Sequence, residues 1–356
     1  MDRYPRRDDL REMAGYHSPQ VTVKVRLNTN ESPIEPPADF VNALATAVRG
    51  VKWNRYPDRA ARALREAIGS LHGVGAENVF VANGSNEVLQ AVLLAYSGAG
   101  RNVATFEPTY QLHSHIARIA GATVVSGKRN ADFSLSIDEV RRVCREHSPS
   151  VTFLCSPNNP TGMAEDPLVV QTAIDSAPGV VVVDEAYAQF SPHTALGHVS
   201  NSSRVAVSRT FSKTWSMAAA RLGYLIAPKW MIDDLEIVTL PYHLDALKQQ
   251  AGLLALQHIK HMEAGVHTVV AERERVLITM RQMPLTVWPS QANFILFRPN
   301  NVPGRTAWQS MLDAGVLVRD CSSWDGLTDC LRVTVGTKDE NDAFLAALRG
   351  AVTARD

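Results

Sequence analysis

Four consecutive valines at positions 180–183 end at a carboxylate, Asp184. β-branched residues favour extended strands, and a run that is apolar on both faces indicates a strand covered by helices on each side. Residues 151–154, Val-Thr-Phe-Leu, form a second run of this kind. Such strands are typical of an open, largely parallel α/β sheet, in which ligands bind at the carboxyl ends of the strands. Asp184 therefore lies where we expect a ligand.

The order of the patterns predicts the rest of the fold. Between residues 79 and 184, β-rich runs alternate with helical patterns; the expected strands are 79–82, 103–106, 123–125 and 151–155, and the expected helices are 87–97 and 110–121. Further along we expect a strand at 223–227, a helical region at about 245–283, and strands at 293–297, 316–319 and 331–335. Glu272, Arg273, Glu274 and Arg275 are expected on a solvated face of that helical region.

Composition excludes several classes of function. The 356 residues are 45% apolar and carry 36 basic and 36 acidic side chains. A net charge of zero argues against a nucleic-acid binder or a membrane-surface protein. The four cysteines lack C-x-x-C spacing, which argues against a disulfide framework or a zinc ribbon. We find no apolar signal segment and no run of about 20 apolar residues, so a cytoplasmic protein is expected.

Two polar loops follow predicted strands. Residues 83–86, Asn-Gly-Ser-Asn, precede a predicted helix. The N–H groups and the positive dipole at such a helix start can bind a phosphate, with the Ser85 hydroxyl as a further donor. The alternative is an ordinary glycine turn with Ser85 or Asn86 as the helix cap. In the second loop, residues 156–162, two prolines fix the chain path, so Asn159 can direct its amide into a crevice.

Asp184 begins the segment Asp-Glu-Ala-Tyr. A buried carboxylate is costly without a positive partner, and a protonated pyridine nitrogen would be one. Tyr187 could then bind the phenolic oxygen of the same ring. A nucleotide hydrolase would have a similar apolar run followed by Asp-Glu, but it also needs a phosphate-binding loop. The nearest match, residues 121–128, has five residues between its glycines instead of four and is followed by Arg129 instead of Ser or Thr.

Lys213 lies 29 positions after Asp184, in the segment Thr-Phe-Ser-Lys at 210–213. Small residues follow at 218–220, so a planar ring could approach the lysine, and burial would lower its pKa toward a usable amine. Arg221 offers a planar fork of donors for a phosphate. An amine, a carboxylate and phosphate donors are what pyridoxal phosphate requires. Most lysines are merely solvated, so the assignment depends on the neighbouring motifs.

Together these residues resemble the aminotransferases of fold type I, and most closely the histidinol-phosphate aminotransferase family. The resemblance covers nearly the whole chain. The segments that carry it are 25–31, 55–58, 82–87, 156–162, 184–187, 210–213, 221–224, 240–244 and 331–337. The chain departs from the family pattern at Ser32, where the family usually has Asn, and at Ala219, where it usually has Gly.

The resemblance implies a large domain over residues 48–248, with a mostly parallel seven-stranded sheet. It also implies a smaller α+β domain formed by residues 1–47 and 249–356. It implies the cofactor pyridoxal 5′-phosphate, with Lys213 on its aldehyde as the proton-transferring group and Asp184 on its pyridine nitrogen. The other cofactor contacts that it implies are Tyr110 on the ring face; Asn159 and Tyr187 at the phenolic oxygen; Gly84, Ser85, Ser212 and Arg221 around the phosphate; and Asn86 and Thr210.

The implied reaction is transamination between L-histidinol phosphate and 2-oxoglutarate in histidine biosynthesis. Arg332 would bind the α-carboxylate of glutamate, and Arg319 would join it on the phosphate of histidinol phosphate. Independently, the alternation of residues 331–335 points Arg332 away from the apolar face of its strand. An exposed arginine on any surface strand would show the same alternation, and without the resemblance that is the favoured interpretation. Tyr16, Asn30 and Asn159 complete the implied substrate contacts. Tyr56 would reach the cofactor phosphate of a second subunit, so the resemblance implies a homodimer with shared active sites and small-molecule substrates.

Other functions stay open on the sequence. An aromatic amino-acid aminotransferase or a threonine-phosphate decarboxylase would use nearly the same cofactor residues. A transcription regulator with an aminotransferase-like domain would need a DNA-binding module, and about 25 residues before Arg26 cannot form one. The paired histidines His113 and His115, and His258 and His261, lack a third metal ligand. We therefore interpret them as solvated helix positions rather than a metal site.

Overall fold

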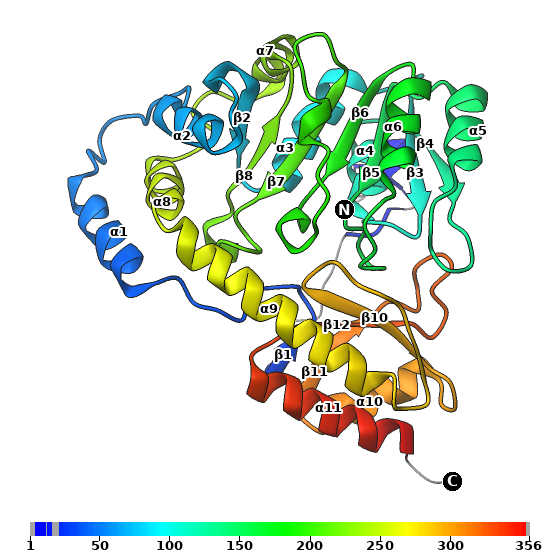
Figure 1. The fold of residues 1–356 in the computed structure, drawn as a ribbon. Helices are drawn as coiled ribbons and strands as arrows, with labels where there is room; N and C mark the ends of the chain where they lie inside the picture. The colour runs from blue at the N-terminus through cyan, green and yellow to red at the C-terminus, as the bar shows by residue number, and fades with distance from the viewer. Residues whose placement is uncertain (1–3, 12, 16–20, 354–356) are drawn as a thin grey trace.

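The computed structural model describes residues 4–11, 13–15 and 21–353. Their strands form two sheets, of seven and five strands. In Figure 1 the larger sheet lies in the upper part of the molecule with helices on both of its faces, and the smaller sheet lies below it. The long helix α9 (Ile259–Met280) runs from one part to the other. No helix in these described stretches is both long and apolar enough to cross a membrane.

The seven-stranded sheet has the order β2-β8-β7-β6-β5-β3-β4. The strands from β7 to β4 are parallel, whereas β8 is antiparallel to both of its neighbours. This confirms the predicted mostly parallel sheet of seven strands. The bounds are β2 (Val79–Ala82), β3 (Asn102–Glu107), β4 (Thr123–Lys128), β5 (Val151–Cys155), β6 (Val180–Asp184), β7 (Val205–Thr210) and β8 (Gly223–Ile226).

The valine run of β6 is buried on both faces. Val180 and Val182 pack into one apolar cluster, and Val181 and Val183 pack into another. Successive side chains of a strand point to opposite faces, so only a strand between two helical layers can bury all four. The sequence interpretation of this run is confirmed.

Helices cover both sheets. The α-helices are α1 (Ala38–Gly50), α2 (Arg62–His72), α3 (Ser85–Tyr96), α4 (Leu112–Ile119), α5 (Ile137–His147), α6 (Pro167–Ser176), α7 (Lys229–Val238), α8 (Ala246–Leu256), α9, α10 (Gly304–Asp313) and α11 (Lys338–Thr353). Short 3₁₀ helices are η1 (Asp8–Leu10), η2 (Ala76–Asn78), η3 (Ala188–Phe190), η4 (Leu196–His198) and η5 (Ala218–Ala220). Asp245 caps α8 by accepting a hydrogen bond from the Lys248 N–H.

The helical region expected at 245–283 is confirmed as two helices, because the chain leaves helical geometry at His258 between α8 and α9. One expectation for this region is wrong. Arg273 is not on a solvated face; its side chain is buried and donates to the carbonyl oxygen of Ala292. Its helix neighbours Val269 and Val276 are buried as well, so Arg273 lies on the inward stripe of α9.

The five-stranded sheet joins both ends of the chain. Its order is β1-β11-β12-β10-β9; β1 is parallel to β11 and the other pairs are antiparallel. The bounds are β1 (Val25–Leu27), β9 (Leu285–Val287), β10 (Phe294–Pro299), β11 (Val316–Asp320) and β12 (Leu331–Thr334). Residues of α9, α10 and α11 share its apolar core. The pairing of β1 with β11 supports grouping the N-terminal segment with the C-terminal part, and the domain boundaries themselves stay a prediction.

Candidate active site

A cavity of about 220 Å³ contains most of the residues singled out from the sequence. It is lined from the large sheet by the carboxyl ends of β5, β6 and β7 and by the start of α3, and from the small sheet by β11 and β12. Its lining residues are Asn28, Thr29, Asn30, Ser85, Asn86, Tyr110, Cys155, Asn159, Asp184, Ala186, Tyr187, Thr210, Ser212, Lys213, Arg221, Arg319 and Arg332. Asn28, Thr29, Cys155 and Ala186 were not predicted from the sequence.

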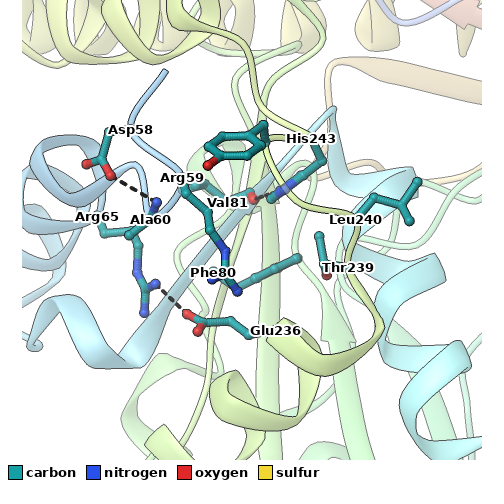
Figure 2. A pocket seen from close by; sticks show the side chains of 11 residues that line it. Asp58, Arg59, Ala60, Arg65, Phe80, Val81, Glu236, Thr239, Leu240 and His243 are labelled. Atoms are coloured by element: carbon teal, nitrogen blue, oxygen red, sulfur yellow. Dashed lines mark hydrogen bonds and ion pairs between the residues drawn. The ribbon is translucent and has the colours of Figure 1, made fainter. Parts of the chain in front are cut away.

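A second cavity, of about 240 Å³, lies beside the edge strand β2 and is lined by residues of α2, α7 and the segment that follows α7 (Figure 2). It contains none of the predicted cofactor or substrate residues. Although this cavity is slightly larger, the amine, carboxylate and phosphate donors gather in the first cavity. We therefore take the first cavity as the reaction site.

Lys213 follows β7, and its side chain is partly buried at the wall of the cavity. Its Nζ donates to the carbonyl oxygen of Thr29 at 3.1 Å and lies 5.9 Å from the centre of the Tyr187 ring. Burial, together with the positive charges of Arg332 and Arg221, lowers the pKa of Lys213 to about 7. A substantial fraction of this amine is therefore neutral near pH 7, and a neutral amine can act as a nucleophile or accept a proton.

Asp184, at the end of β6, is buried and surrounded by hydrogen-bond donors. One carboxylate oxygen accepts from the Ser208 hydroxyl at 3.0 Å and from the Ala186 N–H at 3.2 Å. The other lies 3.0 Å from His113 Nε2. A carboxylate only accepts, so His113 carries its hydrogen on Nε2. Both oxygens of a carboxylate that lines the cavity are thus held by hydrogen bonds.

The interpretation of His113 as a solvated helix position is wrong. Its side chain is fully buried, and its ring stacks on Phe153 with centroids 4.6 Å apart and planes 5° apart. The histidine comes from α4, whose buried face also includes Ile116 and Ala117. Neither His113 nor Ser208 was predicted to contact Asp184. One signal was available, because Tyr110 and His113 are three residues apart in the helix predicted at 110–121, and residues at that spacing share a side of a helix.

The start of α3 lies against a guanidinium. Gly84 has φ +83°, and a Cβ built there would lie 2.7 Å from Arg221 Nη2. The positive φ favours glycine, and a side chain at this position would displace the Arg221 guanidinium. Arg221 Nη1 donates to the Ser212 hydroxyl at 3.1 Å, and Ser85 begins the helix. N–H groups, hydroxyls and a guanidinium thus converge at one helix start, which is the arrangement a phosphate dianion requires.

Arg319 and Arg332 face each other in register on β11 and β12. Arg332 is buried; it donates to Asn159 Oδ1 and, at 3.0 Å, to the carbonyl oxygen of Asn28. Its strand neighbours Leu331 and Val333 pack into the apolar core instead, as the alternation of the sequence indicated. Among the described residues, the buried Arg332 Nε has no hydrogen-bond partner. This polar atom at the cavity wall is therefore available to a ligand.

Tyr187 closes the site beneath Lys213. Its buried hydroxyl accepts from Asn30 Nδ2 at 3.0 Å, and burial raises the pKa of this phenol well above its usual value. Tyr187 therefore stays protonated and can donate to an anionic oxygen. Tyr56 does not line the cavity of its own chain; it is 80% exposed and stacks on Tyr242 with centroids 4.4 Å apart. Tyr16 lies outside the described residues.

Comparison with known proteins agrees with this geometry. Residues 22–348 match the model of the family "Aminotransferase class I and II". The chain is 46% identical to a histidinol-phosphate aminotransferase of Thermobifida fusca, over 98% of this chain and 95% of the relative. It is 44% identical to one of Frankia casuarinae, over 99% and 91%. It shares its fold with the histidinol-phosphate aminotransferase of Sinorhizobium meliloti solved in complex with pyridoxal-5′-phosphate, with a TM-score of 0.83, 21% identity and coverage of 93% and 91%.

Proposed function

Because this chain belongs to the class I and II aminotransferase family, we propose that it transfers an amino group between L-histidinol phosphate and 2-oxoglutarate. The observation that carries the proposal is one cavity holding an amine of lowered pKa, a buried carboxylate and a pair of arginines. The cofactor is pyridoxal 5′-phosphate, which supplies an electron sink for the carbanion formed at the substrate Cα. In the biosynthetic direction, imidazole acetol phosphate and glutamate react to give histidinol phosphate.

The residues of the cavity fit this cofactor. Lys213 would hold its aldehyde, and Asp184 would pair with its pyridine nitrogen. Gly84, Ser85, Ser212 and Arg221 would bind the phosphate, and Asn86 and Thr210 complete the contacts at that end. Tyr187 and Asn159 would bind the phenolic oxygen, and Tyr110 would cover the ring. The buried Arg332 Nε, which has no hydrogen-bond partner among the described residues, supports a ligand at this place.

Lys213 is the group suited to move the proton. In its neutral form Nζ can accept a proton from the substrate Cα, and the protonated amine can donate this proton in a later step. Lys213 thus acts first as base and then as acid. A pKa of about 7 matches this task, because the amine then exchanges protons readily in both directions near neutral pH. The charge of Asp184, held by Ser208 and His113, would keep the ring nitrogen protonated.

The arginine pair would select the substrate. Arg332 binds a carboxylate or a phosphate through its planar fork, and Arg319 adds a second positive charge opposite it. Two arginines favour a phosphorylated substrate over phenylalanine or tyrosine. A threonine-phosphate decarboxylase would also bind a phosphate, but it would release carbon dioxide. Asn30, Asn159 and Tyr16 are the further substrate contacts of the proposal.

Assays with histidinol phosphate, phenylalanine and tyrosine, each against 2-oxoglutarate, test this function. We expect the highest kcat/KM with histidinol phosphate and no carbon dioxide release. Arg319→Leu should raise the KM for histidinol phosphate by roughly ten- to a hundredfold, because a charge-assisted hydrogen bond contributes about 1.5–3 kcal/mol. The KM for glutamate should change by less than about threefold by the same reasoning. An equal rise in KM for both substrates, or a wild-type preference for phenylalanine, would show that Arg319 does not recognise the phosphate.

The proposal includes a homodimer, in which Tyr56 of each subunit completes the site of the other. The support is the exposure of Tyr56, which does not line the cavity of its own chain and whose ring stacks on Tyr242. Residues 48–248 would form the cofactor-binding domain, and residues 1–47 with 249–356 the small domain. A cytoplasmic location fits a biosynthetic enzyme and stays part of the proposal.

A further inference from the structure

His243 contacts the edge of the large sheet from the segment between α7 and α8. Its ring Nε2 lies 2.9 Å from the carbonyl oxygen of Val81, on the outermost strand β2. A carbonyl oxygen only accepts, so Nε2 carries the hydrogen and donates. The ring also stacks on Phe80, with centroids 5.8 Å apart and planes 12° apart. Figure 2 shows the ring reaching the backbone of β2.

The backbone of His243 makes a second hydrogen bond, to Asn83 in the turn between β2 and α3. Its carbonyl oxygen accepts from Asn83 Nδ2 at 2.9 Å. Asn83 directly precedes Gly84 and Ser85, and its own N–H donates to Glu87 in the first turn of α3. His243 therefore contacts Phe80, Val81 and Asn83, which are the last part of β2 and the first residue of the turn. One residue thereby links the sheet edge to the helix start where Arg221 lies.

The segment that carries His243 is itself held in an uncommon conformation. Tyr242 has φ +59°, in the left-handed region that non-glycine residues rarely adopt. Its ring stacks on Tyr56. A strained residue persists only where its surroundings over-determine it, so Tyr242 fixes the path of the chain into His243.

We propose that His243 is a positioning residue for the phosphate-binding turn 83–85, acting through Val81 and Asn83 without touching the ligand. The proposal rests on the proposed function and assigns a role to a residue outside the cavity. A preorganised anion site depends on donors held within about 0.5 Å of their working positions. Without the ring donor, the end of β2 would lose its anchor and the turn would sample other positions.

The test compares two ligands of the same apoprotein. Pyridoxal 5′-phosphate uses the turn, whereas pyridoxal, which lacks the phosphate, does not. We expect His243→Leu to weaken the affinity for pyridoxal 5′-phosphate about five- to tenfold, since one hydrogen bond is lost. The affinity for pyridoxal should stay within about twofold, because its contacts with Lys213 and Asp184 do not involve the turn. His243→Gln keeps an N–H donor at a similar reach and should retain most of the affinity for the phosphorylated ligand.

His261→Leu is the matched control, because His261 also directs ring Nε2 at a backbone carbonyl oxygen, that of Glu35 at 3.2 Å. It should leave the affinity for both ligands unchanged. Equal weakening of both ligands in His243→Leu, or unchanged affinity for pyridoxal 5′-phosphate, would overturn the positioning role. Wild-type protein that bound neither ligand would instead overturn the proposed function, and this inference with it.

Discussion

At the scale of single residues, burying Lys213 lowers the stability of the folded protein, and the same burial gives the amine the lowered pKa that its chemistry requires. Burial lowers its pKa from 10.5 to about 7. Below pH 7 the lysine is protonated in both the folded and the unfolded apoprotein, so the folded state bears the full cost of the buried charge. Between pH 7 and 10.5 the unfolded chain binds a proton that the folded chain does not. The stability of the folded apoprotein therefore rises with pH across this window.

Lys213→Met should stabilise the apoprotein by about 1–3 kcal/mol at pH 6.5, since one pKa unit corresponds to roughly 1.4 kcal/mol and the side chain is only partly buried. The gain should shrink markedly by pH 9.5, because the wild-type lysine is then mostly neutral in the folded state. Urea unfolding at both pH values measures it. The packing contribution of methionine does not depend on pH, so a gain of equal size at the two values would show that the lysine charge is not the cause.

At the scale of elements, a buried ion pair joins the ends of β6 and β7. Glu185 Oε2 accepts from Arg209 Nη2 at 2.7 Å and from Thr194 at 2.8 Å. We expect Glu185→Gln to destabilise the protein by about 3–5 kcal/mol, because it leaves the Arg209 charge buried without a counterion. The half-exposed pair of Glu139 with Arg142 is the control, and Glu139→Gln should cost less than about 1 kcal/mol. Similar losses in the two variants in urea unfolding would contradict this account.

How much of the fold could be predicted from the sequence depended on how clear a pattern each element carries. The valine run of β6 can be buried only as a strand between two helical layers. Motifs that follow strands gather at one edge of a parallel sheet, so most of the residues that line the cavity could be predicted. The strands β1 and β9 have three residues each and carry no periodic signal. The error at Arg273 came from its charged neighbours, although Val269 and Val276 mark the buried stripe. His113 was missed because its burial depends on packing against Phe153, from a distant part of the chain.

At the scale of the whole molecule, the proposed homodimer with shared active sites makes a specific prediction for mixed dimers. Lys213→Ala and Tyr56→Ala dimers should each be impaired, but their hybrid contains one site with both residues intact. Random exchange makes half of the dimers hybrids, so a mixture should recover roughly a quarter of the wild-type sites. Activity after subunit exchange measures the recovery. If the mixture is no more active than the average of the two variants, Tyr56 acts in the site of its own subunit or in neither site.

The role of Lys213 is tested most directly by finding the residue to which the cofactor is attached. Holoprotein is treated with borohydride, which fixes the bond between an amine and the cofactor aldehyde, and is then digested and analysed by peptide mass spectrometry. We expect one phosphopyridoxyl group per chain, on the peptide that contains Lys213. A label on another lysine, or no label on a protein saturated with pyridoxal 5′-phosphate, would contradict it.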